Sequence, residues 1–463
     1  MNPVPDEAMT GSYGGSRLSS DTQAPPDLAF DGRGDAAAHA EVGAEMAPED
    51  ARILEAVTDQ SAWMTDLLSR LVQAPTTLGN EEPGQRIVET ALREMGLDPV
   101  DVEMDAEALR AHPLAAPFDW DVEGKRNVVA TWNPTGPTGG RSLILNGHID
   151  VVSPEPRSQW GDRDPFGGHY EDGWLHGRGS ADMKCGLAAI LGAVKALRSL
   201  ELSPHASVIV ESVVEEECSG NGTLQTLLSG YTADAAVIGE PFGAAITTSQ
   251  VGVLWFRVRI VGVPGHAAEG RNATNAIEKS LSVIGALREL ETEMNLAPPP
   301  PFDLYTRPIN LNVGAIRGGD WPSTVPGVCV TDYRIALFPG TPIADLKARI
   351  EQVVVDATLD QPGSAEVLYR GFSSEGYDIA DDHPLITTLA RAFEYQSGAP
   401  PALVSTTGTT DAAVFGNVGG IPAVCFGPYA EQAHGVHERV YLPSVVQTAQ
   451  VLGLFIRDWC GLS

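Results

Sequence analysis

The sequence predicts an α/β fold, in which a mixed sheet with helices on both faces carries an inserted, ferredoxin-like domain of order β-α-β-β-α-β. Short runs rich in β-branched residues, at 143–145, 208–210 and 235–238, are typical of buried parallel strands. Stretches with helical periodicity lie between these runs. Residues 252–261 instead alternate between apolar and more polar side chains, which indicates a second sheet with one solvated face.

The chain of 463 residues is too long for one ordinary core, so two domains and a tail are expected. Residues 1–48 are rich in Gly, Ser, Pro and Asp and have few large apolar side chains, which predicts a disordered tail. Helical periodicity begins near Pro48, and a strand at 127–132 begins the sheet. The loop at 152–176 is long for an α/β unit, and loops of that length are usually functional.

The pattern changes after Glu240. Alternating strands and amphipathic helices then follow in the order β-α-β-β-α-β, and a helix at 383–396 resumes the first pattern. We therefore expect a first domain formed by residues 49–246 and 376–463, with residues 247–375 inserted as a second domain.

Charge and cysteine content exclude several classes of function. The 30 Lys and Arg residues against 61 Asp and Glu give a net charge of −31, which argues against binding to nucleic acid or anionic membranes. No apolar run reaches the roughly 18 residues of a membrane span, and the N-terminus has no signal-peptide pattern. Five scattered cysteines without a CxxC pair suit reduced thiols, so a cytoplasmic protein is predicted.

Side chains that bind divalent metals follow the ends of the predicted strands, and the carboxyl ends of such strands meet at one crevice. A lone histidine after a strand is more often structural, and Glu-rich loops are usually solvated. Buried carboxylates and imidazoles at the ends of at least four strands are, however, costly unless paired or metal-bound. The candidate ligands are His148, Asp182, Glu217, Glu240 and His434.

This oxygen- and nitrogen-rich set suits two divalent ions, with zinc as the first expectation and cobalt or manganese as alternatives. Asp182 is the natural bridge between the ions. Asp150 can accept the second imidazole N–H of His148 and fix its tautomer. Glu216 and Glu217 are consecutive and project to opposite sides of an extended backbone, so one can bind metal while the other acts as general base.

The motifs that carry these residues resemble those of the M20 metallopeptidase family, whose members include acetylornithine deacetylase, succinyl-diaminopimelate desuccinylase, aminoacylase and glutamate carboxypeptidase. The resemblance covers nearly everything after the tail. The motifs are Gly147-His148-Ile149-Asp150, Gly177-Arg178-Gly179 through Lys184, Glu215-Glu216-Glu217, Gly239-Glu240-Pro241, Gly262 through His266, and Ala433-His434 through Glu438.

The resemblance implies roles for individual residues. Glu216 would be the general base, and Asp182 would bridge one ion held by His148 and Glu240 and another held by Glu217 and His434. Substrate contacts would come from His266, often supplied by a partner subunit in the family, from Arg334, which would hold a substrate carboxylate, and from the loop with Gly408 and Thr409, whose amides could bind an anion.

These features together predict a di-metal amidohydrolase that cleaves N-acyl amino acids or related small amides. The inserted domain would close over the substrate and could form a homodimer. A dipeptidase or carboxypeptidase with the same centre is the main alternative. A non-catalytic homologue that keeps the fold is the other, although such a protein has no need of a base beside two metals.

Overall fold

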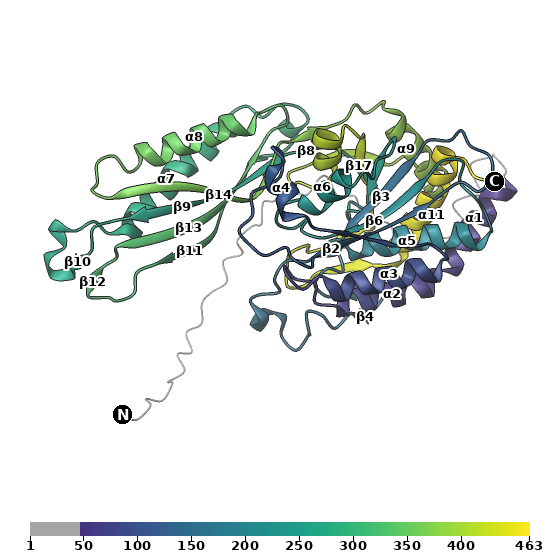
Figure 1. The fold of residues 1–463 in the computed structure, drawn as a ribbon, viewed down its shortest axis with the longest axis horizontal. Coiled ribbons are helices and arrows are strands. Elements are labelled where there is room, and N and C mark those ends of the chain that lie inside the picture. Colours follow the sequence, from purple (N-terminus) through teal and green to yellow (C-terminus); the bar gives the residue numbers. More distant parts are fainter. Residues whose placement is uncertain (1–46) are drawn as a thin grey trace, which may run out of the picture.

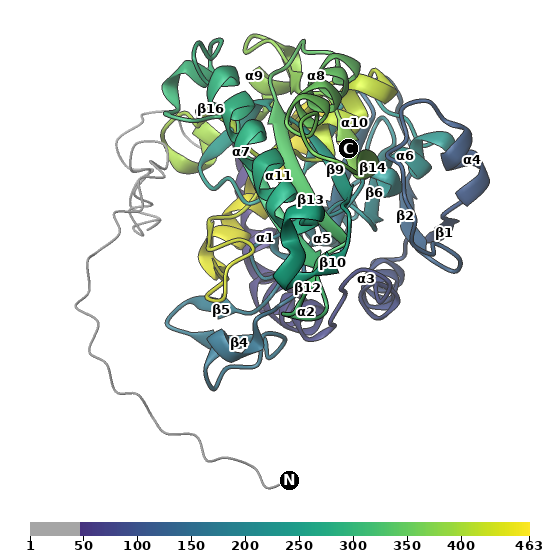
Figure 2. The same cartoon turned by 90° about the vertical axis from the view of Figure 1, so that its left-hand side faces the viewer.

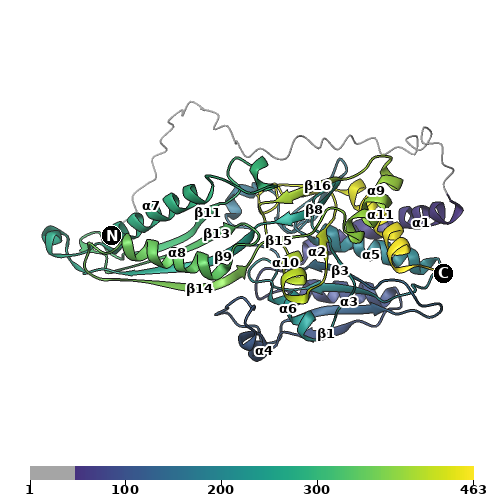
Figure 3. The ribbon, with the colours of Figure 1, turned by 90° about the horizontal axis from the view of Figure 1, so that it is seen from above.

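The computed structural model describes residues 47–463, so the predicted tail lies almost wholly outside the described residues. Two large sheets stand at opposite ends of an elongated molecule (Figures 1 and 3). One has nine strands and helices on both faces, and the other has four strands and two helices. The predicted α/β fold class is confirmed.

The nine-stranded sheet is mixed, and its four central strands, β6, β3, β7 and β17, run parallel. Antiparallel strands flank this core on both sides, so the carboxyl ends that face one crevice are those of the central four. In spatial order the strands are β1 (Val100–Glu103), β2 (Arg126–Trp132), β6 (Val208–Val213), β3 (Leu143–His148), β7 (Ala236–Ile238), β17 (Ala423–Cys425), β8 (Ala245–Gln250) and β15 (Tyr377–Asp378), with β16 (Ala402–Thr406) also paired to β8.

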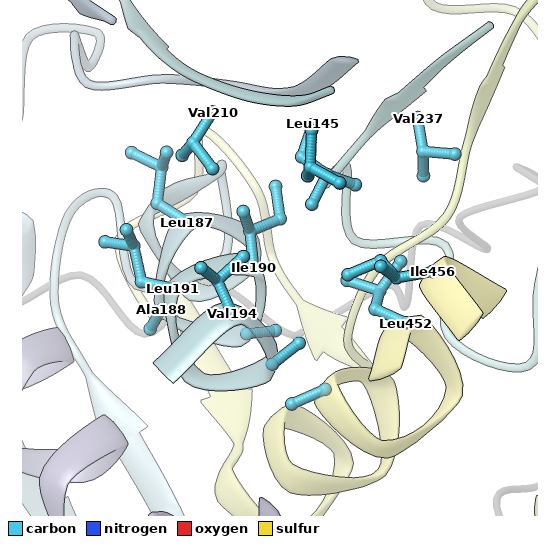
Figure 4. Close-up of a cluster of buried hydrophobic side chains, with 14 of the residues drawn as sticks. Leu145, Leu187, Ala188, Ile190, Leu191, Val194, Val210, Val237, Leu452 and Ile456 are labelled. Atoms are coloured by element: carbon cyan, nitrogen blue, oxygen red, sulfur yellow. The ribbon is translucent and has the colours of Figure 1, made fainter. Parts of the chain in front are cut away.

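Helices cover one face of this sheet in a thick layer. Figure 4 shows the core between this layer and the sheet. Leu145, Val210 and Val237 of the sheet pack there near Leu187 and Ile190 of α5, the central helix. The layer consists of α1 (Pro48–Asp59), α2 (Ser61–Gln73), α3 (Glu82–Glu94), α5 (Lys184–Ser199), α9 (Pro384–Ser397) and α11 (Leu442–Cys460).

The opposite face packs on shorter segments through a smaller core that includes Ile144, Ile238 and Phe415. These segments are α6 (Asn221–Leu228), α10 (Ala412–Val414) and the π-helical turn Phe415–Gly419, while α4 (Ala106–Ala111) lies beside α6 at the end of β1.

One close approach fixes α5 against the sheet. A Cβ atom at Gly186 would lie 1.8 Å from the carbonyl oxygen of Gly239, so only glycine allows the first turn of α5 to meet the end of β7.

The second sheet has the predicted ferredoxin-like connectivity. Its strands β9 (Gly252–Val261), β11 (Leu311–Gly318), β13 (Val328–Leu337) and β14 (Ser364–Ser374) are antiparallel in the order β11-β13-β9-β14. Helices α7 (Ala276–Met294) and α8 (Ile343–Asp356) cover one face. Figure 2 looks from this end of the molecule, where β10 (Gly265–His266) pairs with β12 (Thr324–Val325).

A third, small sheet was not predicted. It joins β4 (His169–Glu171) and β5 (Trp174–His176), from the long loop after β3, to β18 (Ala430–Glu431) and β19 (Arg439–Tyr441) near the C-terminus. Each strand has only two or three residues, which is too short for a period to appear in the sequence. Short 3-10 turns occupy Arg157–Trp160, Ala267–Asn272 and Phe302–Leu304. Within residues 47–463, no helix has the length and apolar character needed to cross a membrane.

Candidate metal centre

The five predicted ligands meet at the carboxyl ends of the parallel strands. His148 is the last residue of β3 and is fully buried. Glu217 lies in the turn after β6, and Glu240 follows β7 by two residues. Asp182 comes from the turn that precedes α5, and His434 from the loop between β18 and β19. Segments far apart in the sequence therefore bring imidazoles and carboxylates to one place.

Asp182 lies between the two histidines. Its Oδ1 atom is 3.0 Å from Nε2 of His148, and its Oδ2 atom is 3.3 Å from Nε2 of His434. An oxygen of Glu217 approaches the same nitrogen of His434 at 3.0 Å. One carboxylate with an oxygen toward each imidazole has the geometry that a ligand shared by two ions requires.

Glu216 and Glu240 approach the same nitrogen of His148 as Asp182 does, but less closely. Each has a carboxylate oxygen 3.8 Å from Nε2 of His148. Donor atoms of His148, Glu216 and Glu240 lie within 4.8 Å of one another, as do those of His148, Asp182 and Glu217. Because Glu216 and Glu240 are equally near His148, distance alone does not separate a base from a ligand, and the assignment of Glu216 as base stays a prediction.

Asp150 holds the site in a way that differs from the expected one. Nδ1 of His148 lies 2.9 Å from the backbone carbonyl oxygen of Asp150 and 3.7 Å from its carboxylate. The carboxylate instead accepts the backbone N–H groups of Glu216, at 3.3 Å, and Glu217, at 3.0 Å. The carbonyl of Asp150 therefore orients the histidine, while its side chain orients the two glutamates.

The first residue of the glutamate triplet serves as an anchor. Glu215 is fully buried and has a positive φ of 64°. Its carboxylate accepts hydrogen bonds from Trp120 at 2.7 Å and from Lys125 at 2.8 Å, and the Lys125 ammonium also pairs with Glu81. These contacts hold the turn whose next two side chains point toward the histidines.

Burial dominates the electrostatics of the cluster. Burial raises the pKa of Glu216 and of Glu240 well above the usual glutamate value. Burial alone would lower the pKa of His434, but its hydrogen bonds with Asp182 and Glu217 outweigh burial and raise that pKa to about 11. Without a cation, protons must balance the crowded carboxylates. A divalent ion would take the place of those protons.

The donor set fits divalent metals. It combines three carboxylates with two imidazoles and, within the described residues, the metal-binding groups include no thiolate. Such donors suit zinc, cobalt or manganese. His148 and Glu240 could hold one ion and Glu217 and His434 a second, with Asp182 shared between them.

His266 is not brought to this cluster within the chain. It is exposed on β10, at the end of the second sheet that lies far from β3 and β6 (Figure 1). Its Nδ1 atom accepts the backbone N–H of Ala268 at 3.1 Å. A catalytic contact by His266 would therefore need a large domain motion or a second subunit.

Arg334 is half-buried on β13, on the face of the sheet that α7 and α8 leave uncovered. In the described part of the chain its guanidinium has no ion pair or hydrogen bond, and burial lowers its pKa. Asp332, on the same strand, pairs with Arg257 at 2.6 Å instead. Arg334 is thus available for an anionic ligand.

The loop with Gly408 and Thr409 lies where the chain passes from the nine-stranded sheet into β9 of the second sheet. The N–H of Gly408 already donates to Oγ1 of Thr406 at 3.0 Å, so it differs from the free anion-binding amide that was expected. Oγ1 of Thr409 donates to the carbonyl of Val251, at the entry to β9, at 2.8 Å. The loop therefore fastens the connection between the sheets.

Four buried ionisable residues near the centre had no role in the sequence analysis. Arg178 and Glu438 form an ion pair between the loops of Asp182 and His434. Beneath the ligands, Glu211 and Asp411 connect through Asn146 and Thr223. Arg178 and Glu438 stood within motifs, but only tertiary contacts reveal their pairing. Glu211 lies within an apolar strand, and a lone charge in such a run was the available signal.

A family model described as peptidase family M20/M25/M40 matches residues 144–458. N-formyl-4-amino-5-aminomethyl-2-methylpyrimidine deformylase from Halalkalibacterium halodurans is 30% identical over 372 residues, covering 74% of this chain and 85% of that protein. Succinyl-diaminopimelate desuccinylase from Paracoccus denitrificans is 29% identical over 346 residues, covering 72% and 86%. Among solved structures, the di-peptidase Dug1p from Saccharomyces cerevisiae matches in fold, with a TM-score of 0.74 and 14% identity, covering 90% of this chain and 99% of that one.

Proposed function

Because the chain belongs to peptidase family M20/M25/M40, a family of hydrolases that act on amide bonds, we propose that it is a two-metal amidohydrolase that cleaves N-acyl amino acids or related small amides. One observation carries the proposal. Asp182 has one oxygen toward His148 and the other toward His434, at 3.0 and 3.3 Å, with a further carboxylate beside each histidine.

In this proposal His148 and Glu240 hold one ion, Glu217 and His434 hold the other, and Asp182 bridges them. Two bound divalent ions, zinc or alternatively cobalt or manganese, would polarise the amide carbonyl and make water easier to deprotonate. Asp150 keeps Glu216 and Glu217 in place through their backbone N–H groups.

Glu216 is the general base. Its carboxylate accepts a proton from the attacking water and passes that proton to the leaving nitrogen, so its charge is restored at the end of the cycle. The burial that raises its pKa keeps bulk water away from the transferred proton. His266, supplied by the partner in a homodimer, would donate a hydrogen bond to the developing oxyanion.

The substrate class is drawn from the relatives and from Arg334. The two relatives named above are a deformylase and a desuccinylase, both of which remove a small acyl group. The unpaired guanidinium of Arg334 suits the carboxylate of an acylated amino acid. A dipeptidase would use the same centre, but those relatives favour a deacylase. In the domain assignment we propose, the inserted domain of residues 247–375 is the lid and dimerisation domain, and the remainder from residue 49 is catalytic.

We place the reaction in the cytoplasm, because all five cysteines are free and buried, as suits a reducing compartment.

The test is hydrolysis of a panel of N-formyl, N-acetyl and N-succinyl amines and amino acids, with dipeptides alongside, by metal-loaded protein. We expect the wild type to release free amine. Glu216→Gln should keep its metal and lose about 10²- to 10⁴-fold in kcat. Glu217→Gln is the matched comparison, because loss of a ligand should lower metal content as well as turnover. Metal binding without cleavage of any panel amide would refute the proposed activity and favour a non-catalytic role.

A further inference from the structure

The turn that carries Asp182 depends on one distant carboxylate. Residues 177–182 lie between β5 and α5, outside any helix or strand. Oε1 of Glu438 accepts three backbone N–H groups from this turn, those of Gly179 at 2.9 Å, Ala181 at 3.0 Å and Asp182 at 3.1 Å. A single oxygen therefore sets the path of the backbone up to the candidate bridging ligand.

The other oxygen of Glu438 pairs with the guanidinium of Arg178, which belongs to the same turn. Arg178 also donates from Nη2 to the backbone carbonyl of His434 at 3.1 Å. His434 has a positive φ of 63°, a conformation that non-glycine residues adopt rarely, so its backbone needs such a tether. The planar guanidinium reaches Glu438 and His434 at once, which a lysine ammonium does less well.

Arg178 and Glu438 are both buried, with 2% and 0% of their surface exposed. Burying two charges is costly unless they are paired and hydrogen-bonded, and the pair can often be replaced by apolar residues without loss of stability. Stability alone therefore does not account for the pair. The pair joins the turn of Asp182 to the loop of His434, two segments more than 250 residues apart in the sequence.

We propose that Arg178 and Glu438 are positioning residues that hold Asp182 and His434 at the separation needed by the ion between them. This inference rests on the proposed function, because it concerns the ion assigned to Asp182, Glu217 and His434. Asp182 is shared by both proposed ions, but His434 serves only one of them, and His148 and Glu240 make none of these contacts. The ion held by Glu217 and His434 should therefore depend on the pair more than the other ion does. Groups that orient metal ligands typically change metal affinity by about 10- to 100-fold when removed.

The test is titration of the metal-free full-length chain with Zn²⁺ against a chromophoric chelator, which gives two stepwise affinities. Arg178→Lys keeps the positive charge and removes the planar guanidinium that contacts Glu438 and His434 at once. Glu438→Gln keeps one oxygen to accept the three backbone N–H groups of the Asp182 turn. We expect each variant to weaken one step by about 10- to 100-fold and the other step by a smaller factor, because Asp182 contributes to both ions and His434 to only one. His434→Ala, which removes a ligand of one proposed ion only, identifies the affected step.

Coupling within the pair gives a second measurement. If Arg178 and Glu438 act as one unit, the double variant should weaken the affected step by about as much as the worse single variant does. If they act independently, the two losses should multiply. If the losses of zinc affinity multiply, Arg178 and Glu438 do not act as one unit in connecting the two loops, and that claim is overturned.

The matched control is Arg457→Met. Arg457 forms a largely buried ion pair with Asp50, between α11 and α1, and contacts none of the ligands. The Arg457→Met substitution should lower the unfolding temperature without changing either zinc affinity. The proposal is overturned if Arg178→Lys binds both ions as the wild type does, if both steps weaken equally, or if Arg178→Lys fails to fold. A wild type that binds no second ion would instead refute the proposed function.

Discussion

The backbone N–H of Glu217 donates a 3.0 Å hydrogen bond to the carboxylate of Asp150, the residue whose carbonyl faces His148. Asp150 therefore connects a ligand on β3 to the turn after β6. We expect Asp150→Asn to lower kcat/KM by about 10- to 100-fold, because its amide group presents a donor where two N–H groups need acceptors. Steady-state kinetics and metal content measure the effect.

Asp105 offers the matched control for Asp150. Its carboxylate also accepts two backbone N–H groups, those of Glu107 and Ala108, both at 3.0 Å, but at the exposed start of α4. Asp105→Asn should change stability little and leave kcat/KM unchanged, because one side-chain oxygen accepts both N–H groups and Asn caps a helix about as well as Asp does. Equal activity in the Asp150 and Asp105 variants would show that the Asp150 carboxylate does not support the centre.

Arg334 gives a prediction about substrates. Replacing it with methionine should lower kcat/KM for an N-acyl amino acid by about 10- to 100-fold, the value of a charge-assisted hydrogen bond. The substitution should leave kcat/KM unchanged for the same substrate with its carboxylate capped as an amide. Because burial lowers the pKa of this guanidinium, the fold disfavours its charge, and Arg334→Met should not reduce the free energy of unfolding.

Arg257 is the control for Arg334, since it lies on the same face of the sheet but is already paired with Asp332. Arg257→Met should leave the ratio between free-acid and capped substrates unchanged. If both arginine variants shift that ratio equally, the recognition of the carboxylate is a general effect of charge on this face.

The extent to which the sequence predicted this molecule follows from the range of the interactions involved. The ends of β3, β6 and β7 were predictable because apolar runs and the ligands after them are local features. The small sheet of β4, β5, β18 and β19 was not, because its strands are too short to show a period. Glu438 could be recognised only after folding, because its three donors lie on the other side of more than 250 intervening residues.

His266 tests the proposed dimer. In a mixture of inactive Glu216→Gln and inactive His266→Ala chains, a mixed dimer would combine an intact base from one chain with an intact His266 from the other. We expect activity to return to about a quarter of the wild-type value after subunit exchange, since half of the dimers are mixed and each has one complete site. Activity that stays at the level of the separate variants would mean that His266 is not supplied by a partner.

The last prediction concerns Glu211, which is fully buried on β6. Its Oε2 atom accepts from Asn146 and Thr226, while within the described residues neither Oε1 of Glu211 nor Oδ1 of Asn146 has a partner. Burial raises the pKa of Glu211 to about 8, with the charge of Asp411 adding to the effect. The carboxyl is therefore protonated at neutral pH, and such a proton could satisfy one of these unpaired oxygens.

The sign of the pH dependence follows. Below the ordinary glutamate value of 4.5 the group is protonated in both the folded and the unfolded chain, and its contribution to stability is fully present. Between 4.5 and about 8 the unfolded chain loses this proton and the folded chain keeps it, so the contribution falls as pH rises. Glu211→Gln is neutral at every pH. Its free energy of unfolding, relative to that of the wild type, should therefore rise by roughly 2–4 kcal/mol between pH 5 and pH 8. Urea unfolding at both pH values measures this difference, and the exposed Glu289→Gln should show none. A constant difference between Glu211→Gln and the wild type would mean that Glu211 is already ionised in the folded protein at pH 5.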